Sequence, residues 1–84
     1  METYQERVGR YRIVRHEELP PAHKAEYRLN GIDPDTLWSL IWSFDDEQSA
    51  NEQLAFCIQH QPDYATHKIV DAGETTYIER TAWF

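Results

Sequence analysis

The sequence predicts an α+β fold, a mostly antiparallel sheet of about four strands with one main helix packed on one face. An alternating apolar run lies between residues 37 and 44, and helix-spaced apolar residues follow it as far as residue 60. Two further strand-like segments are separated by a short turn near residue 72. At 84 residues the chain has the length of one domain, so residues 1–84 are expected to form a single unit.

The first strand is expected over residues 9–16, where Tyr11 and Ile13 fall on one face. Residues 1–8 fit either a frayed chain start or a short helical turn. Pro20 and Pro21 must interrupt regular structure, because proline donates no backbone hydrogen bond and restricts the residue before it.

After these prolines, a short helix is predicted over residues 22–29. Pro21 suits the first helical position, and Gly31 follows the C-terminal end. The alternative is a strand over residues 26–29 that turns at Asn30 and Gly31. The helix is the preferred interpretation.

The clearest strand is predicted over residues 37–44, after a turn at Asp33-Pro34-Asp35. Its four large apolar side chains alternate with other residues, so they are expected to share one face of the sheet. These four are Trp38, Leu40, Trp42 and Phe44, and between them lie Ser39, Ile41 and Ser43.

The main helix is expected to begin with Asp45 or Asp46 as its N-cap and to run to about His60. Pro62 then ends it. Apolar residues at helical spacing form one stripe that should face the sheet. The stripe consists of Ala50, Leu54, Cys57 and Ile58.

The last two strands, over residues 64–71 and 74–83, are predicted to form a hairpin around the turn from Asp71 to Glu74. The path from strand 37–44 through the main helix to strand 64–71 fits a right-handed crossover.

The charge distribution is uneven. The formal net charge is −7, and four of the eight Lys and Arg residues lie in the first fifteen positions. Between Arg28 and Lys68 there is no Lys or Arg, but there are seven Asp and Glu residues. The negative electrostatic field of this segment repels nucleic acid and anionic lipid and favours a basic protein partner. Direct nucleic-acid binding and membrane binding are therefore not expected.

Nothing in the sequence points to an oxidising compartment. The N-terminal residues lack the apolar core of a signal peptide, and the run from 37 to 44 is too short to cross a bilayer. Cys57 is the only cysteine, so no intramolecular disulfide can form. The cytoplasm is the expected location.

Cys57, His60 and His67 are one candidate zinc group. Cys57 and His60 are three residues apart on the predicted helix, and His67 lies on the following strand. A fourth ligand is not evident, and Cys57 falls on the apolar stripe, where a free cysteine packs as a small hydrophobe. A packing role for Cys57 is therefore preferred to metal binding or nucleophilic catalysis.

Asp45, Asp46 and Glu47 form a carboxylate cluster, which helix capping explains better than acid–base or calcium chemistry. His16, with acidic residues after it at positions 17 and 18, fits a solvated strand end better than a proton relay.

Motifs of catalysis and cofactor binding are missing. With three glycines, at positions 9, 31 and 73, the chain cannot form a Gly-rich phosphate loop, and it contains no Gly-x-Ser-x-Gly motif. No enzyme activity and no cofactor are expected.

An acidic surface with aromatic residues remains as the candidate site. Phe56 falls away from the apolar stripe of the main helix and beside Glu52, and an aromatic residue among acids is a common interface anchor. Cover by the N-terminal segment or by a dimer mate is the alternative explanation. The residues expected to bind a partner are Asp45, Asp46, Glu52, Phe56, Tyr64 and Trp83.

In size, acidity and lack of catalytic residues, the chain resembles the small antagonists that phages and mobile elements direct against host machinery, such as anti-CRISPR proteins and acidic DNA mimics. The resemblance covers composition only. It implies an inhibitor or adaptor that binds a basic, nucleic-acid-handling protein.

Two alternatives remain open. One is a small ligand- or metal-binding domain that uses Cys57 and His60. The other is a homo-oligomeric structural protein, with a homodimer as its simplest form, in which the arginine-rich first strand pairs with the acidic segment of a neighbour.

Overall fold

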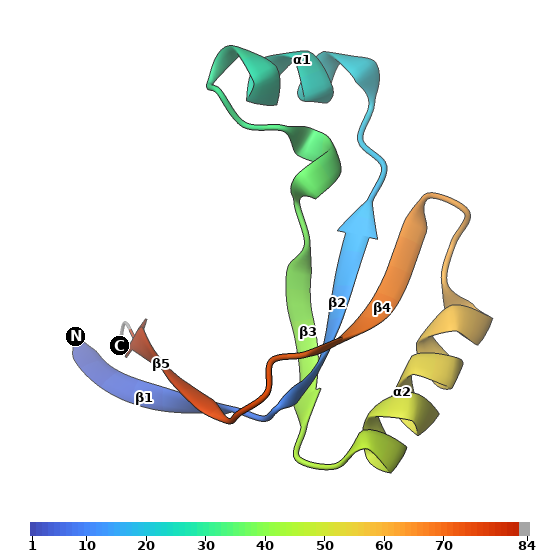
Figure 1. The fold of residues 1–84 in the computed structure, drawn as a ribbon. Coiled ribbons are helices and arrows are strands. Elements are labelled where there is room, and N and C mark those ends of the chain that lie inside the picture. The colour runs from blue at the N-terminus through green and yellow to red at the C-terminus, as the bar shows by residue number, and fades with distance from the viewer. Residues whose placement is uncertain (83–84) are drawn as a thin grey trace.

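The computed structural model describes residues 1–82, which form five strands and two α-helices (Figure 1). The elements are β1 (Glu2–Val8), β2 (Tyr11–Glu17), α1 (Pro21–Leu29), the 3₁₀ helix η1 (Pro34–Thr36), β3 (Ser39–Phe44), α2 (Glu47–His60), β4 (Ala65–Asp71) and β5 (Thr76–Ala82). The α+β class is confirmed, and every strand pairing is antiparallel. No helix in the described part of the chain is both long and apolar enough to span a membrane.

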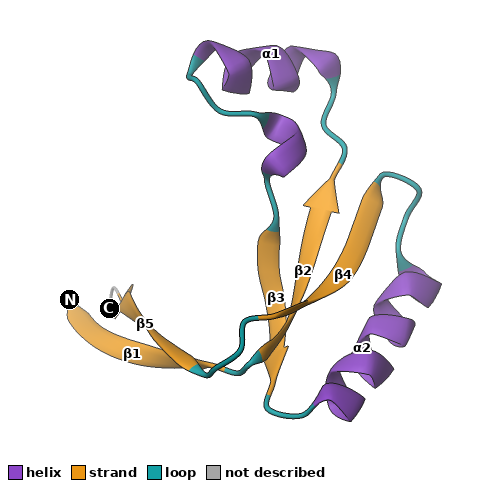
Figure 2. Ribbon diagram, viewed as in Figure 1, coloured by secondary structure: helices purple, strands orange, loops and turns teal. Residues whose placement is uncertain are grey.

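The strands form two sheets instead of one. Three strands in the order β3-β2-β4 form the larger sheet, and α2 packs along it (Figure 2). Because β3 and β4 both run antiparallel to β2, they are parallel to each other and are connected through α2, as a crossover requires. The handedness of that crossover stays a prediction. Helix α1 lies beyond one end of the sheet, against η1.

The predicted hairpin between the last two strands is wrong. β5 pairs with β1 over seven positions, from Glu2 opposite Ala82 to Val8 opposite Thr76, and the two form a separate ribbon. Residues 1–8 are therefore mostly strand, not a frayed start or a helical turn. After β4 the chain meets the start of β2, where the Ala72 N–H donates to the Arg10 carbonyl at 2.9 Å. From there β5 follows β1 and leaves β4.

Gly9 joins the ribbon to the larger sheet. Its N–H donates to Ser43 Oγ at 3.0 Å, and a Cβ atom placed on Gly9 would lie 2.6 Å from the carbonyl oxygen of Phe44. No side chain fits at that distance, so glycine is what allows this close approach to β3. Val8, the preceding residue, is buried.

A bulge in β3 overturns the predicted apolar face. Ile13 pairs with Trp42 and Val14 pairs with Leu40, which leaves Ile41 as an extra residue. Residues directly opposite each other share a face, and the neighbours Ile13 and Val14 point to opposite faces. Leu40 and Trp42 therefore lie on different faces, although simple alternation places them together.

The core lies between α2 and the larger sheet. Ile13 and Ala50 are both 0% exposed, and Ala65 on β4, which pairs with Glu17, is 3% exposed. Leu54 and Cys57 are half-buried, as the predicted stripe requires. Ile58 is 49% exposed, so its assignment to the stripe is wrong. It lies about 80° around the helix from Ala50, farther than Leu54 at about 40° and Cys57 at about 20°.

The chain is open for its size. The radius of gyration is 15.3 Å, whereas a compact domain of this length has about 12 Å. The accessible surface is 6310 Å², against about 5,200 Å² for a monomer of this mass. The protruding ribbon and α1 account for this shape, and they leave apolar surface without cover.

Candidate functional site

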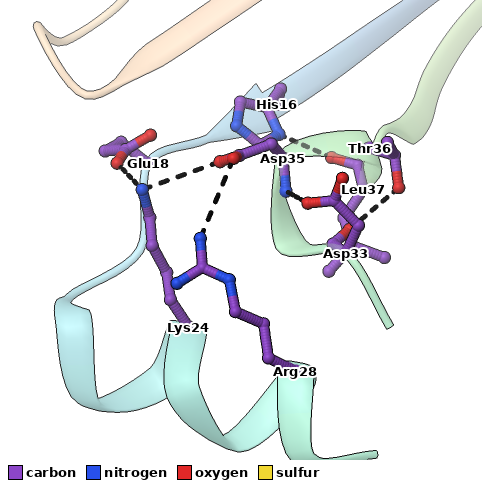
Figure 3. Close-up of polar contacts among 8 residues, drawn as sticks. All are labelled: His16, Glu18, Lys24, Arg28, Asp33, Asp35, Thr36 and Leu37. Carbon is purple, nitrogen blue, oxygen red and sulfur yellow. Dashed lines mark hydrogen bonds and ion pairs between the residues drawn. The ribbon is translucent and has the colours of Figure 1, made fainter. Parts of the chain in front are cut away.

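A polar cluster joins α1 to the end of β2 (Figure 3). The Lys24 ammonium lies between two carboxylates: it bonds to Glu18 Oε1 and lies 3.6 Å from Asp35 Oδ1. Arg28 reaches Asp35 at 4.0 Å. The Lys24 hydrogen bond lowers the pKa of Glu18, and the same bond raises the pKa of Lys24. Two carboxylates thus face two cations. These contacts hold α1 against the end of β2, although α1 has no buried residue of its own.

The same cluster has metal-ligating groups. One ligand atom each from His16, Glu18 and Asp35 lies within 4.8 Å of the other two, and no other such group was found among the described residues. His16 Nδ1 lies 2.7 Å from the Leu37 carbonyl, so it donates there and leaves Nε2 as an acceptor. The Lys24 ammonium already compensates the carboxylates, so a divalent cation would have to displace it.

The sequence does not predict this group. It places His16 and Glu18 at a solvated strand end, and Asp35 in a turn. Asp35 is held by η1, where its N–H donates to Asp33 Oδ1 at 2.9 Å. No spacing rule links positions 18 and 35, because only the loop geometry between α1 and β3 brings them together.

Cys57, His60 and His67 do not meet. The His60 ring packs on Phe56, with ring centroids 4.5 Å apart, while His67 Nδ1 lies 2.9 Å from Gln61 Oε1. Burial, and then the nearby Arg15 charge, lower the pKa of His67. Cys57 is half-buried, as its predicted packing role requires.

Two of the acidic residues expected to bind a partner are used by the fold. Asp46 caps α2 by accepting from the Ser49 N–H at 2.8 Å, and that hydrogen bond lowers its pKa. Asp45 pairs with Arg7 Nη2 at 2.7 Å and so ties the ribbon to the start of α2.

The outer face of α2 remains free. Phe56 is 58% exposed, and Glu52 lies one turn before it, bonded to Gln48 Nε2 at 3.3 Å. Neither Glu52 nor Glu47 forms an ion pair with any described residue. Tyr64, beyond the C-terminal end of α2, is also exposed. Trp83 lies outside the described residues.

A cavity of about 510 Å³ lies between α1 and the adjoining ends of β2 and β3. Leu19, Tyr27, Leu37 and Ile41 give it apolar walls, and Arg15 contributes its one cation. Arg15 Nη2 pairs with Glu17 at 2.8 Å, but the buried Arg15 Nε has no hydrogen-bond partner within the described chain. No pattern in the sequence predicts this cavity, because its lining residues come from segments that only the folded chain brings together.

No protein-family model matches the chain, and no curated protein and no solved structure was found to be similar to it.

Proposed function

We propose that the chain is a non-enzymatic protein-binding domain and that the outer face of α2 meets a basic partner. The observation that carries this proposal is the combination of exposed Phe56 with Glu47 and Glu52, neither of which forms an ion pair with a described residue. Helix α2 contains no Lys or Arg from Glu47 to His60. Its field attracts a basic surface, while the ring supplies an apolar anchor.

The class of partner follows from the negative charge of this surface. Basic grooves that bind nucleic-acid phosphates are complementary to carboxylates on a rigid helix. We therefore propose a nucleic-acid-handling protein as the partner, and inhibition by occupation of its groove as the mode of action. This is the antagonist function that the composition suggests.

The experiment uses charge reversal at Glu52, because substitution of Asp46 would remove a helix cap and substitution of Asp45 would break an ion pair. The tagged chain captures partners from nuclease-treated lysate at low and moderate salt, in parallel with Glu52→Lys, Phe56→Ala and Glu79→Lys. Glu79 is exposed on the ribbon, so its reversal changes net charge equally and serves as the control. Equal loss with Glu52→Lys and Glu79→Lys would contradict a site on α2.

The purified partner then tests the mode of action. Association should slow with Glu52→Lys and with added salt, since both weaken long-range attraction. A labelled nucleic acid bound to the partner should be displaced by the wild-type chain and retained with Glu52→Lys. A partner that binds the chain and its nucleic acid together would refute inhibition and leave an adaptor.

A further inference from the structure

The free edge of β3 has no charged residue. In the order β3-β2-β4, one side of β3 pairs with β2 and the other side pairs with no strand of the described chain. From Ser39 to Phe44 the strand contains neither charge nor proline, and Ile41 and Trp42 are 38% and 51% exposed. Such an edge is a template for pairing with another strand.

The other edges are protected by charge. β4 carries Lys68 and ends at Asp71. In the ribbon, β1 contains Glu6 and Arg7, and β5 contains Arg80 next to a glutamate. Within β3 the bulge at Ile41 is the one protective device, and it exposes a further apolar side chain. The ribbon contributes Glu6, Arg7 and Arg80 to a hollow that it shares with Leu40 to Ser43.

We propose that a second copy of this chain pairs antiparallel with β3 along this edge, across a two-fold axis, to form a continuous six-stranded sheet. An uncharged strand pairs with itself without like-charge repulsion, although each copy carries a net −7. This interface lies at β3, away from the outer face of α2, and does not depend on the function proposed above.

The exposed area matches a dimer. The accessible surface of 6310 Å² exceeds that of a monomer of this mass by about 1,100 Å². A specific interface buries about 800 Å² on each partner. Pairing through β3 can therefore return the surface of each copy to the normal range.

Antiparallel pairing brings the Phe44 end of each β3 to the Ser39 end of the other. The charged groups near these ends are already used within one copy. Asp45 pairs with Arg7 and Arg15 pairs with Glu17, so the pairing rests on the uncharged edge itself.

The antiparallel arrangement also directs the ribbon of one copy toward the cavity of the other. The ribbon departs from the Phe44 end of β3 and extends past its free edge, and residues of both line a shared hollow (Figure 1). The cavity of about 510 Å³ lies at the Ser39 end. In the two-fold pair, the ribbon of each copy is directed toward the α1 end of the other, where that cavity is open.

Sedimentation equilibrium tests the proposal with two isoleucine substitutions. The wild-type chain should have twice the mass of one chain, and Ile41→Lys should weaken association on the order of 100-fold or more, because the axis brings two ammonium groups together. Ile58→Lys is the control: it changes the same residue type at similar exposure, on α2 away from the β3 edge. A wild-type monomer at high concentration, or a dimer that survives Ile41→Lys with native circular dichroism, would overturn the proposal.

If Ile41→Lys fails to fold, cysteine cross-linking tests the β3 interface instead. In a Cys57→Ser background, single cysteines replace each residue from Leu40 to Ser43, and Ile58→Cys serves as the control. The position nearest the axis should oxidise to a covalent dimer, and the control should not. A wild-type dimer that cross-links at none of these positions would exclude β3 as the interface.

Discussion

The core contact between β2 and α2 can be tested at Ile13 by removing one methylene group. Ile13 is 0% exposed and lies opposite Ile69 and Trp42 in the sheet, in the layer that α2 covers. Removal of a buried methylene costs about 0.8 kcal/mol in transfer free energy, and the residual cavity raises the expected loss for Ile13→Val to about 1 kcal/mol. Alanine would cost about 3 kcal/mol, a large part of the stability of about 5 kcal/mol expected for so small a domain, so valine is the better probe.

The matched control is Ile58→Val, the same chemical change at a side chain that is 49% exposed. Its expected cost is below about 0.5 kcal/mol, because water already contacts the removed group. Urea denaturation at one fixed protein concentration measures both, since dimerisation makes stability depend on concentration. In thermal unfolding, Ile13→Val should lower Tm by about 4–8 °C. Equal losses at the two positions would refute the placement of the core at Ile13.

Two further predictions concern ion pairs. Arg10 binds Asp71 through two hydrogen bonds of 2.8 and 2.9 Å and, with the Gly73 N–H, lowers the Asp71 pKa to about 2. A lowered folded-state pKa contributes stability above the unfolded value of about 3.9 that is lost as pH falls toward 2, so the difference in urea midpoint between wild type and Asp71→Asn should shrink from pH 7 to pH 2. A difference independent of pH would contradict this linkage. At the α1 cluster, zinc should leave the wild-type Tm unchanged and raise that of Lys24→Ala, because loss of the ammonium frees Glu18 and Asp35 beside His16. Adding His16→Gln to Lys24→Ala should abolish that gain, and a zinc-dependent Tm in the wild type would show that Lys24 does not block the site.

The helices could be predicted from the sequence because their signals are local. Pro21 begins α1, and Asp46 caps α2, which ends at His60 as expected. Capping and proline geometry act within one helical turn, so no distant residue had to be known. The strand predicted over residues 37–44 is found, but β3 begins only at Ser39, and the bulge at Ile41 breaks the alternation on which the prediction rested.

The candidate site could be predicted only in part. The helical position of Phe56 indicated a face away from the apolar stripe, but it left open whether another segment covers the ring; the structure shows Phe56 exposed. The roles of Asp45 and Asp46 differ: capping of α2 by Asp46 is a local feature, whereas the Asp45 ion pair with Arg7 depends on a ribbon that was not foreseen. The cavity and the Lys24 cluster both require the position of α1 in space.

By itself, the sequence determined the α+β class, the helix boundaries and the acidic outer face of α2, since each depends on interactions between near neighbours in the chain. The tertiary structure decided which strands pair. β5 pairs with β1 and not with β4, and a bulge at Ile41 places the apolar residues of β3 on two different faces. Strand pairing depends on partners many residues apart and on a register in which one extra residue reverses every side chain beyond it.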